Sequence, residues 1–179
     1  MMFKIRISLV LFILIGCSEL PENSMEYSRR EIPDQESWGV TITLTDEGLR
    51  RAVVKSGHLQ KFHDRQFINL DQNVDIDFFD DNENHTSNLL SQFATVDEKT
   101  NSMKAVGQVI VVSDSGVTLF TDTLSWDNRK ELVFTNDSVM VVTEEKDTLY
   151  GVGFESDMGL EYWKILKPSG VIGQDNNDD

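Results

Sequence analysis

The stretch GQVIVVSDSGVTLFTDTLSW, residues 107–126, decides what kind of fold this chain can adopt. Apolar residues, many of them β-branched, alternate with polar or smaller ones on both sides of the short sequence SDSG, residues 113–116. Alternation with a period of two, interrupted by a glycine-containing turn, is typical of a β-hairpin. We therefore expect two antiparallel strands here, over residues 107–112 and 116–126.

The same alternation continues on both sides of this hairpin. Further strands are predicted over residues 40–45, 74–79, 131–135 and 138–143. The turn sequences DDNEN, DNRK, TND and EEKD separate predicted strands. Residues 44–56 resemble a helix only briefly, and Gly48 within them favours a turn that leads into a strand. Because no window keeps a helical period, the sequence predicts an all-β antiparallel protein.

The chain also contains an internal repeat. Residues 94–111 align with residues 124–141, and each copy reads as a strand, an acidic turn and a second strand. Asp97 falls on Asp127, and a weaker third copy places Asp157 at the same position. Their recurrence at matching turns predicts that these carboxylates accept hydrogen bonds from turn backbone, rather than act in catalysis.

The stretch LFILIGCSEL, residues 11–20, holds the only cysteine, Cys17. Lys4 and Arg6 precede an apolar run that is much shorter than the roughly 20 residues of a membrane-spanning helix. The run has the size of the apolar region of a signal peptide. LIGC resembles a bacterial lipobox, in which the cysteine is lipidated and becomes the new N-terminus. The alternative is an ordinary signal peptide followed by a chance cysteine.

These features predict a domain layout. We expect a lipoprotein signal peptide over residues 1–16, a lipidated Cys17 with a flexible linker over 17–37, one β domain over 38–168, and a disordered acidic tail over 169–179. A single cysteine cannot form an internal disulfide, so the domain has to rely on its apolar core.

The chain is strongly acidic. Its formal net charge is −15, from 31 Asp and Glu against 16 Lys and Arg, and loss of Lys4 and Arg6 with the signal peptide would bring it to −17. Nucleic-acid binding depends on cationic side chains that neutralise phosphates, so nucleic acid is excluded as a partner. The same charge argues against lying flat on an anionic membrane.

No pattern of residues points to catalysis or to a metal. His58, His63 and His85 lack zinc-site spacing and are expected at the surface. DDNEN, residues 80–84, lacks the glycine and distal glutamate of a calcium loop. No nucleophile elbow, phosphate loop or clear carboxylate pair is present. We therefore expect no enzyme, no cofactor and no metal site.

The segment from Lys104 to Val142 resembles the OstA-like unit of lipopolysaccharide-transport proteins. The residues that carry the resemblance are Ala105, Gly107, Val109, Val111, Gly116, Leu119, Thr121, Leu124, Trp126, Asp127, Val139 and Val141. Residues 38–168 as a whole resemble the LptC family, the periplasmic component of the lipopolysaccharide export ABC transporter. Many members are held by a single membrane-spanning helix, whereas this chain resembles a lipoprotein variant.

The resemblance implies a twisted, open antiparallel β-jellyroll with a V-shaped cross-section, whose inner faces hold lipid A acyl chains. The residues expected to line this groove are Ile76, Phe78, Val109, Val111, Leu119, Leu124, Trp126, Phe134, Val139 and Val141, with Val133 expected to face outward. A closed protein core would use the same alternation, so the sequence leaves lipid contact and core packing open.

The resemblance also implies a function. The protein would accept lipopolysaccharide from an inner-membrane ABC transporter and pass it to the next jellyroll, an OstA-like protein of a periplasmic bridge. It would be lipid-anchored at the periplasmic face of the inner membrane. The strand edges expected to contact partners contain Ile42, Leu44, Trp163 and Ile165. The alternative is a scaffold lipoprotein whose sheet edges bridge other proteins without carrying lipid.

Overall fold

The structure is a computed structural model that describes residues 32–170. From Pro33 onward these residues belong to one compact unit. They form eleven strands: β1 (Gln35–Asp46), β2 (Leu49–Phe62), β3 (Phe67–Asp71), β4 (Val74–Phe79), β5 (His85–Ser91), β6 (Phe93–Asp97), β7 (Ser102–Ser113), β8 (Thr118–Asp127), β9 (Leu132–Val142), β10 (Thr148–Ser156) and β11 (Trp163–Ser169).

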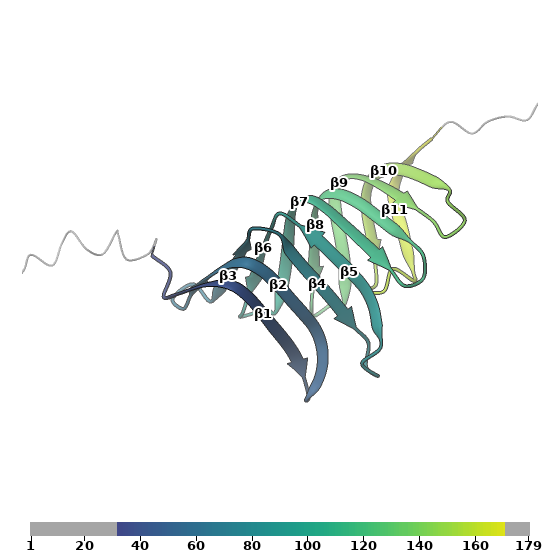
Figure 1. The fold of residues 1–179 in the computed structure, drawn as a ribbon. Helices are drawn as coiled ribbons and strands as arrows, with labels where there is room; N and C mark the ends of the chain where they lie inside the picture. Colours follow the sequence, from purple (N-terminus) through teal and green to yellow (C-terminus); the bar gives the residue numbers. More distant parts are fainter. Residues whose placement is uncertain (1–31, 171–179) are drawn as a thin grey trace, which may run out of the picture. The chain divides into compact units, whose positions relative to one another are not determined.

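All eleven strands join one sheet, and every pairing in it is antiparallel (Figure 1). The strand order is β11-β10-β9-β8-β7-β5-β4-β2-β3-β6, with β1 on β2 and a further pairing between β6 and β7. The predicted all-β jellyroll is confirmed. β1 begins a few residues before the predicted domain start, and β11 ends at Ser169.

Two long strands divide the sheet into two arms. The first half of β2 pairs with β4 and its second half with β3. The second half of β7 pairs with β5 and its first half with β6. We call the part around β4 and β5 arm A, and the part around β3 and β6 arm B. β8, β9 and β10 continue both arms, because each pairs with its neighbours in both arms.

The arms meet at a crease that runs across the strands. The Gly57 N–H of β2 donates to the Gln72 carbonyl (3.1 Å), and the Gln92 N–H donates to the Gly107 carbonyl of β7 (3.0 Å). A Cβ atom at Gly57 would lie 2.6 Å from the Gln72 carbonyl oxygen, so only glycine allows this close approach. Register shifts in the β7–β8, β8–β9 and β9–β10 pairings continue the crease.

The crease explains one wrong prediction. Residues 131–135 and 138–143 were predicted as two strands separated by a turn at TND, but β9 runs without interruption from Leu132 to Val142. The Asp137 N–H donates to Thr135 Oγ1 (3.1 Å), a local bond where the strand bends. The polar residues that resemble a turn in the sequence are a bend within one strand.

The apolar core lies between the inner faces of the two arms. Val54, Ile76 and Leu89 of arm A join one buried cluster with Leu59 and Leu70 of arm B. Alternate residues of each strand are buried, as in the pattern of β4 and β9. The alternation in the sequence therefore places one apolar face of the folded sheet against the other.

Candidate functional site

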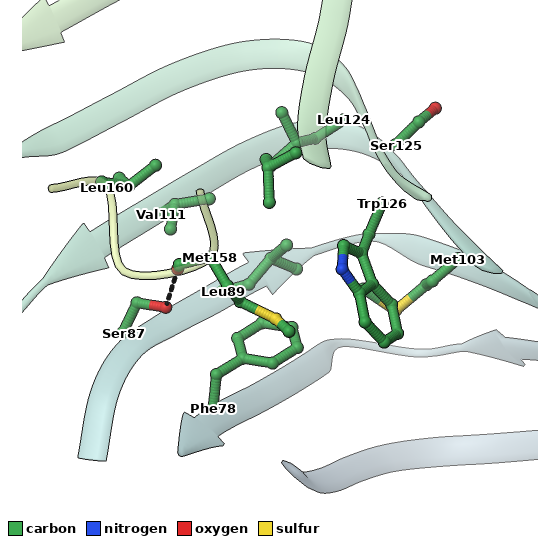
Figure 2. A pocket seen from close by; sticks show the side chains of 11 residues that line it. Phe78, Ser87, Leu89, Met103, Val111, Leu124, Ser125, Trp126, Met158 and Leu160 are labelled. Carbon is green, nitrogen blue, oxygen red and sulfur yellow. Dashed lines mark hydrogen bonds between the residues drawn. The ribbon is translucent and has the colours of Figure 1, made fainter. Parts of the chain in front are cut away.

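Between the arms lies a small space with uncharged walls (Figure 2). Its lining comes from β4, β5, β7, β8, β9 and the β10–β11 loop: Phe78, Ser87, Leu89, Met103, Val111, Leu124, Ser125, Trp126, Val133, Met158 and Leu160. Its volume is about 20 Å³, which is close to the minimum that holds one water molecule. This space is far too small to hold an acyl chain.

Most of the residues predicted to line a groove do lie on this inner face. Eight of them are buried: Ile76, Phe78, Val109, Val111, Leu119, Leu124, Val139 and Val141. Trp126 is half-buried and lines the space. Burial of this kind fits a protein core as well as a lipid site, so their contact with lipid stays a prediction.

The predicted orientation of Phe134 was wrong. Val133, expected to face outward, is 7% exposed and lines the inner space, whereas Phe134 is half-buried and lies opposite Ser125 and Glu155 in the sheet. Because β9 is one strand, its two halves share one phase, and Val133 therefore faces the same side as Val139.

The loop between β10 and β11 takes part in the site, which was not predicted. Leu160 of this loop is 1% exposed, and Met158 packs against the core. Neither residue belongs to a strand, so alternation could not identify them. The only available signal was a pair of apolar residues inside the otherwise polar sequence SDMGLE, residues 156–161.

Trp126 contributes one unsatisfied polar atom to the wall. Its indole Nε1 is buried and has no hydrogen-bond partner among the described residues. Figure 2 shows the indole ring at the border of the space. A buried donor without an acceptor is unfavourable, and a ligand that brings an oxygen atom to this wall would relieve it.

The prediction that all three histidines lie at the surface was wrong for His58. Its side chain is buried on β2, and its ring lies between two carboxylates: Nδ1 is 3.0 Å from Asp71 Oδ2 and Nε2 is 2.9 Å from Glu36 Oε1. The hydrogen bond to Asp71 is the main cause that raises the pKa of His58; burial opposes it, and Glu36 adds to it. Hydrogen bonds from Gln60 and His58 lower the pKa of Glu36.

The other two histidines are exposed, as predicted. Within residues 32–170, no group of three or more His, Cys, Asp or Glu side chains is placed to hold a metal ion.

The three repeated aspartates lie at turns, as predicted. Asp97 Oδ1 accepts from the backbone N–H of Lys99 (2.8 Å), and Asp127 Oδ1 accepts from that of Arg129 (3.1 Å). Asp157 Oδ1 accepts from the Glu161 N–H (2.8 Å). Their turn-bonding role is therefore confirmed.

Two strands have an open edge in the described sheet. β1 pairs only with β2, and β11 pairs only with β10. The residues predicted to contact partners lie on these strands: Ile42 and Leu44 on β1, Trp163 and Ile165 on β11. An open edge presents unpaired backbone groups to another strand, but contact with partners stays a prediction.

The fold and the site define a β-jellyroll with an uncharged apolar interior and two open edges. The profile of the family described as lipopolysaccharide-assembly, LptC-related, matches residues 9–167, and the chain belongs to this family. The chain is thus a component of lipopolysaccharide transport, in a family that is not an enzyme family and is associated with the periplasmic side of the inner membrane. A search of curated proteins finds no match.

Several predictions concern residues that lie outside the described part of the chain. These are the signal peptide, Cys17 with its lipid, most of the linker, and the tail beyond Gly170. Among the residues that are described, no helix is long and apolar enough to cross a membrane.

Proposed function

We propose that this protein carries lipopolysaccharide by holding its acyl chains between the two arms. It would accept the lipid from the inner-membrane ABC transporter and pass it to the next jellyroll of a periplasmic bridge. The observation that carries the proposal is the wall of the interior: none of the residues that line it is charged, and both arms contribute to it, in a member of the LptC-related family.

The charge of the protein indicates how the lipid would bind. The chain is strongly acidic, so it repels the phosphates of the lipid head at long range. Binding would come from burial of acyl chains, at roughly 25 cal/mol per Å² of apolar surface removed from water. The head would stay in solvent. Because the space of about 20 Å³ is too small for a chain, binding requires the arms to separate.

The open edges supply a route for transfer. A neighbouring jellyroll would add its own edge strand to β1 or β11, which would align the interiors of the two proteins. Cys17, once lipidated, would hold the domain at the periplasmic face of the inner membrane.

The closed interior favours a second candidate, the scaffold without lipid. A core packed this tightly needs no lipid to be complete, and the open edges alone would suffice to bridge partner proteins. The two candidates differ in whether lipid ever reaches the inner face.

Photocrosslinking in cells distinguishes the lipid carrier from the scaffold. A photoreactive residue at Val133 faces the inner space, and the same residue at Phe134, next to it on the same strand, is the matched control. We expect a lipopolysaccharide adduct at Val133 that depends on ATP hydrolysis by the transporter, and little at Phe134. Protein adducts at β1 and β11 without any lipid adduct at Val133 would support the scaffold.

A further inference from the structure

The loop between β10 and β11, residues 157–162, joins the two arms, and we call it the strap. It leaves arm B at Ser156, the last residue of β10, and returns to arm B at Trp163, where Trp163 pairs with Ser156. Between these points its backbone is bound by arm A. The strap therefore spans the gap between the arms at the ends that lie farthest from the crease.

Two buried serines of arm A hold the strap. Ser87 Oγ on β5 donates to the Met158 carbonyl (3.0 Å), which Figure 2 shows as a dashed line, and Ser113 Oγ on β7 donates to the Gly159 carbonyl (2.5 Å). Ser87 is 0% exposed, and this is its one side-chain hydrogen bond within the described residues. A buried hydroxyl without a partner is unfavourable, so Ser87 favours the closed strap. Ser113 Oγ also lies 2.9 Å from Ser115 Oγ, so it keeps a partner when the strap leaves.

The strap also supplies apolar material to the interior. Met158 and Leu160 line the space together with Phe78 and Leu89 of arm A. Both side chains are aliphatic, and the long unbranched chain of Met158 resembles a segment of alkyl chain in size and polarity. The strap thus covers part of the inner face with apolar side chains, which resemble an acyl chain chemically.

Three features make the strap easy to displace. The backbone of Leu160 is in the left-handed region (φ 55°), which is unfavourable for a leucine, so the closed strap contains a strained residue. Asp157 Oδ1 accepts from the Glu161 and Tyr162 N–H groups, so the loop keeps its own hydrogen bonds after it leaves arm A. The strand that follows it, β11, is paired on one side only.

From these contacts we propose that the strap is a displaceable plug: Met158 and Leu160 occupy the acyl-chain site, and the strap leaves arm A when lipid enters. This inference rests on the proposed function. In this proposal the Ser87 and Ser113 hydroxyls hold the strap in place, and the strap regulates the access of lipid to the interior.

A reversible disulfide tests the proposal directly. A Cβ atom built at Gly159 lies 4.0 Å from Thr86 Cβ on β5, within the range that a disulfide requires. The double variant Thr86→Cys/Gly159→Cys would lock the strap to arm A under oxidation and free it under reduction. Each single cysteine variant is a control for the substitutions themselves and for any reaction of Cys17.

The readout is the lipopolysaccharide adduct at a photoreactive Val133 in the full-length chain. We expect oxidation of the double variant to reduce the adduct at least tenfold, reduction to restore it, and both single variants to match the parent chain. Equal adducts in the oxidised and reduced double variant would overturn the plug and leave the proposed function intact. A parent chain without adduct would overturn the proposed function, and the plug with it.

A second experiment weakens the contact between the strap and arm A instead of locking it, and uses one test variant and one control. Ser87→Ala removes the bond to the Met158 carbonyl, and Ser91→Ala, the matched control on the same strand, removes an equally long buried bond to the Phe93 carbonyl at the crease. We expect Ser87→Ala to increase the rate of adduct formation several-fold and Ser91→Ala to leave it unchanged. Equal rates in the two variants would contradict the plug.

Discussion

His58 has the most constrained environment of the three histidines. Asp71 of β3 and Glu36 of β1 accept hydrogen bonds at its two ring nitrogens, and Trp38 of β1 stacks on the ring with centroids 5.2 Å apart. An imidazole donates from both nitrogens only when it is protonated. A protonated His58 therefore ties the edge strand β1 to β2 and β3.

This arrangement predicts how stability depends on pH. The pKa of His58 is raised in the folded protein, so its contribution is complete below the ordinary histidine pKa of about 6.5. It is lost as the pH rises through the raised pKa of the folded state. We expect His58→Gln to lower the urea midpoint at pH 6, and to lower it much less at pH 9.

Urea unfolding of the parent, His58→Gln and His63→Gln at several pH values checks this prediction. His63 is the control, because its side chain is 62% exposed. The charged and polar groups around the His58 ring are Glu36, Asp71 and, through Glu36, Gln60. A midpoint difference for His58→Gln that stays constant with pH would contradict the protonated clamp.

Individual strands differ in how far their sequences reveal them. Residues 74–79 were predicted as a strand and form β4, because their alternation is strict and turns flank both ends. β3 and β5 were missed, and β6 was expected only as the first strand of the repeat over residues 94–111. In β3 only Leu70 is buried, so this strand leaves little alternation in the sequence. In β5 two of the inward positions are Ser87 and Ser91, so the inner face does not look apolar in the sequence.

The candidate site was only partly predictable for the same physical reasons. Alternation identified most of the buried inner-face residues, because apolar residues in a strand alternate when one face of the strand is buried. It could not place Met158 and Leu160, which lie in a loop, and it gave the wrong side for Phe134 because the bend in β9 resembles a turn. Contacts between distant loops and strands leave no periodic signal in a sequence.

The crease yields a prediction at the scale of the element. Gly57→Ala would place a Cβ atom 2.6 Å from the Gln72 carbonyl oxygen, and overpacking of this kind costs about 1–3 kcal/mol. Gly48→Ala is the control, because it has φ 86° but no atom within 4 Å of the added Cβ, so it costs only about 1–2 kcal/mol of backbone strain.

Chemical unfolding of the two glycine variants measures the difference. We expect Gly57→Ala to lose more stability than Gly48→Ala, because the backbone oxygen of Gln72 can move only if the two arms shift at the crease. Losses in the opposite order would show that the crease is pliable at this point.

At the scale of the whole domain, the central question is whether the arms move. An apolar interior shared by both arms, a strap that joins them and a space of about 20 Å³ describe a closed state. The LptC-related family assigns the chain to lipopolysaccharide transport. Carriage of acyl chains inside this fold then requires an open state, in which the strap has left arm A and the crease acts as a hinge.

The most direct measurement is the distance between the arms with and without lipid. Spin labels would be placed at Glu145, in the β9–β10 turn of arm A, and at Arg129, in the β8–β9 turn of arm B; both positions are exposed. The chain would carry Cys17→Ser so that only these sites react. We predict that lipopolysaccharide shifts the distance distribution to longer values. A distribution that is unchanged at saturating lipopolysaccharide would contradict the carriage of acyl chains between the arms.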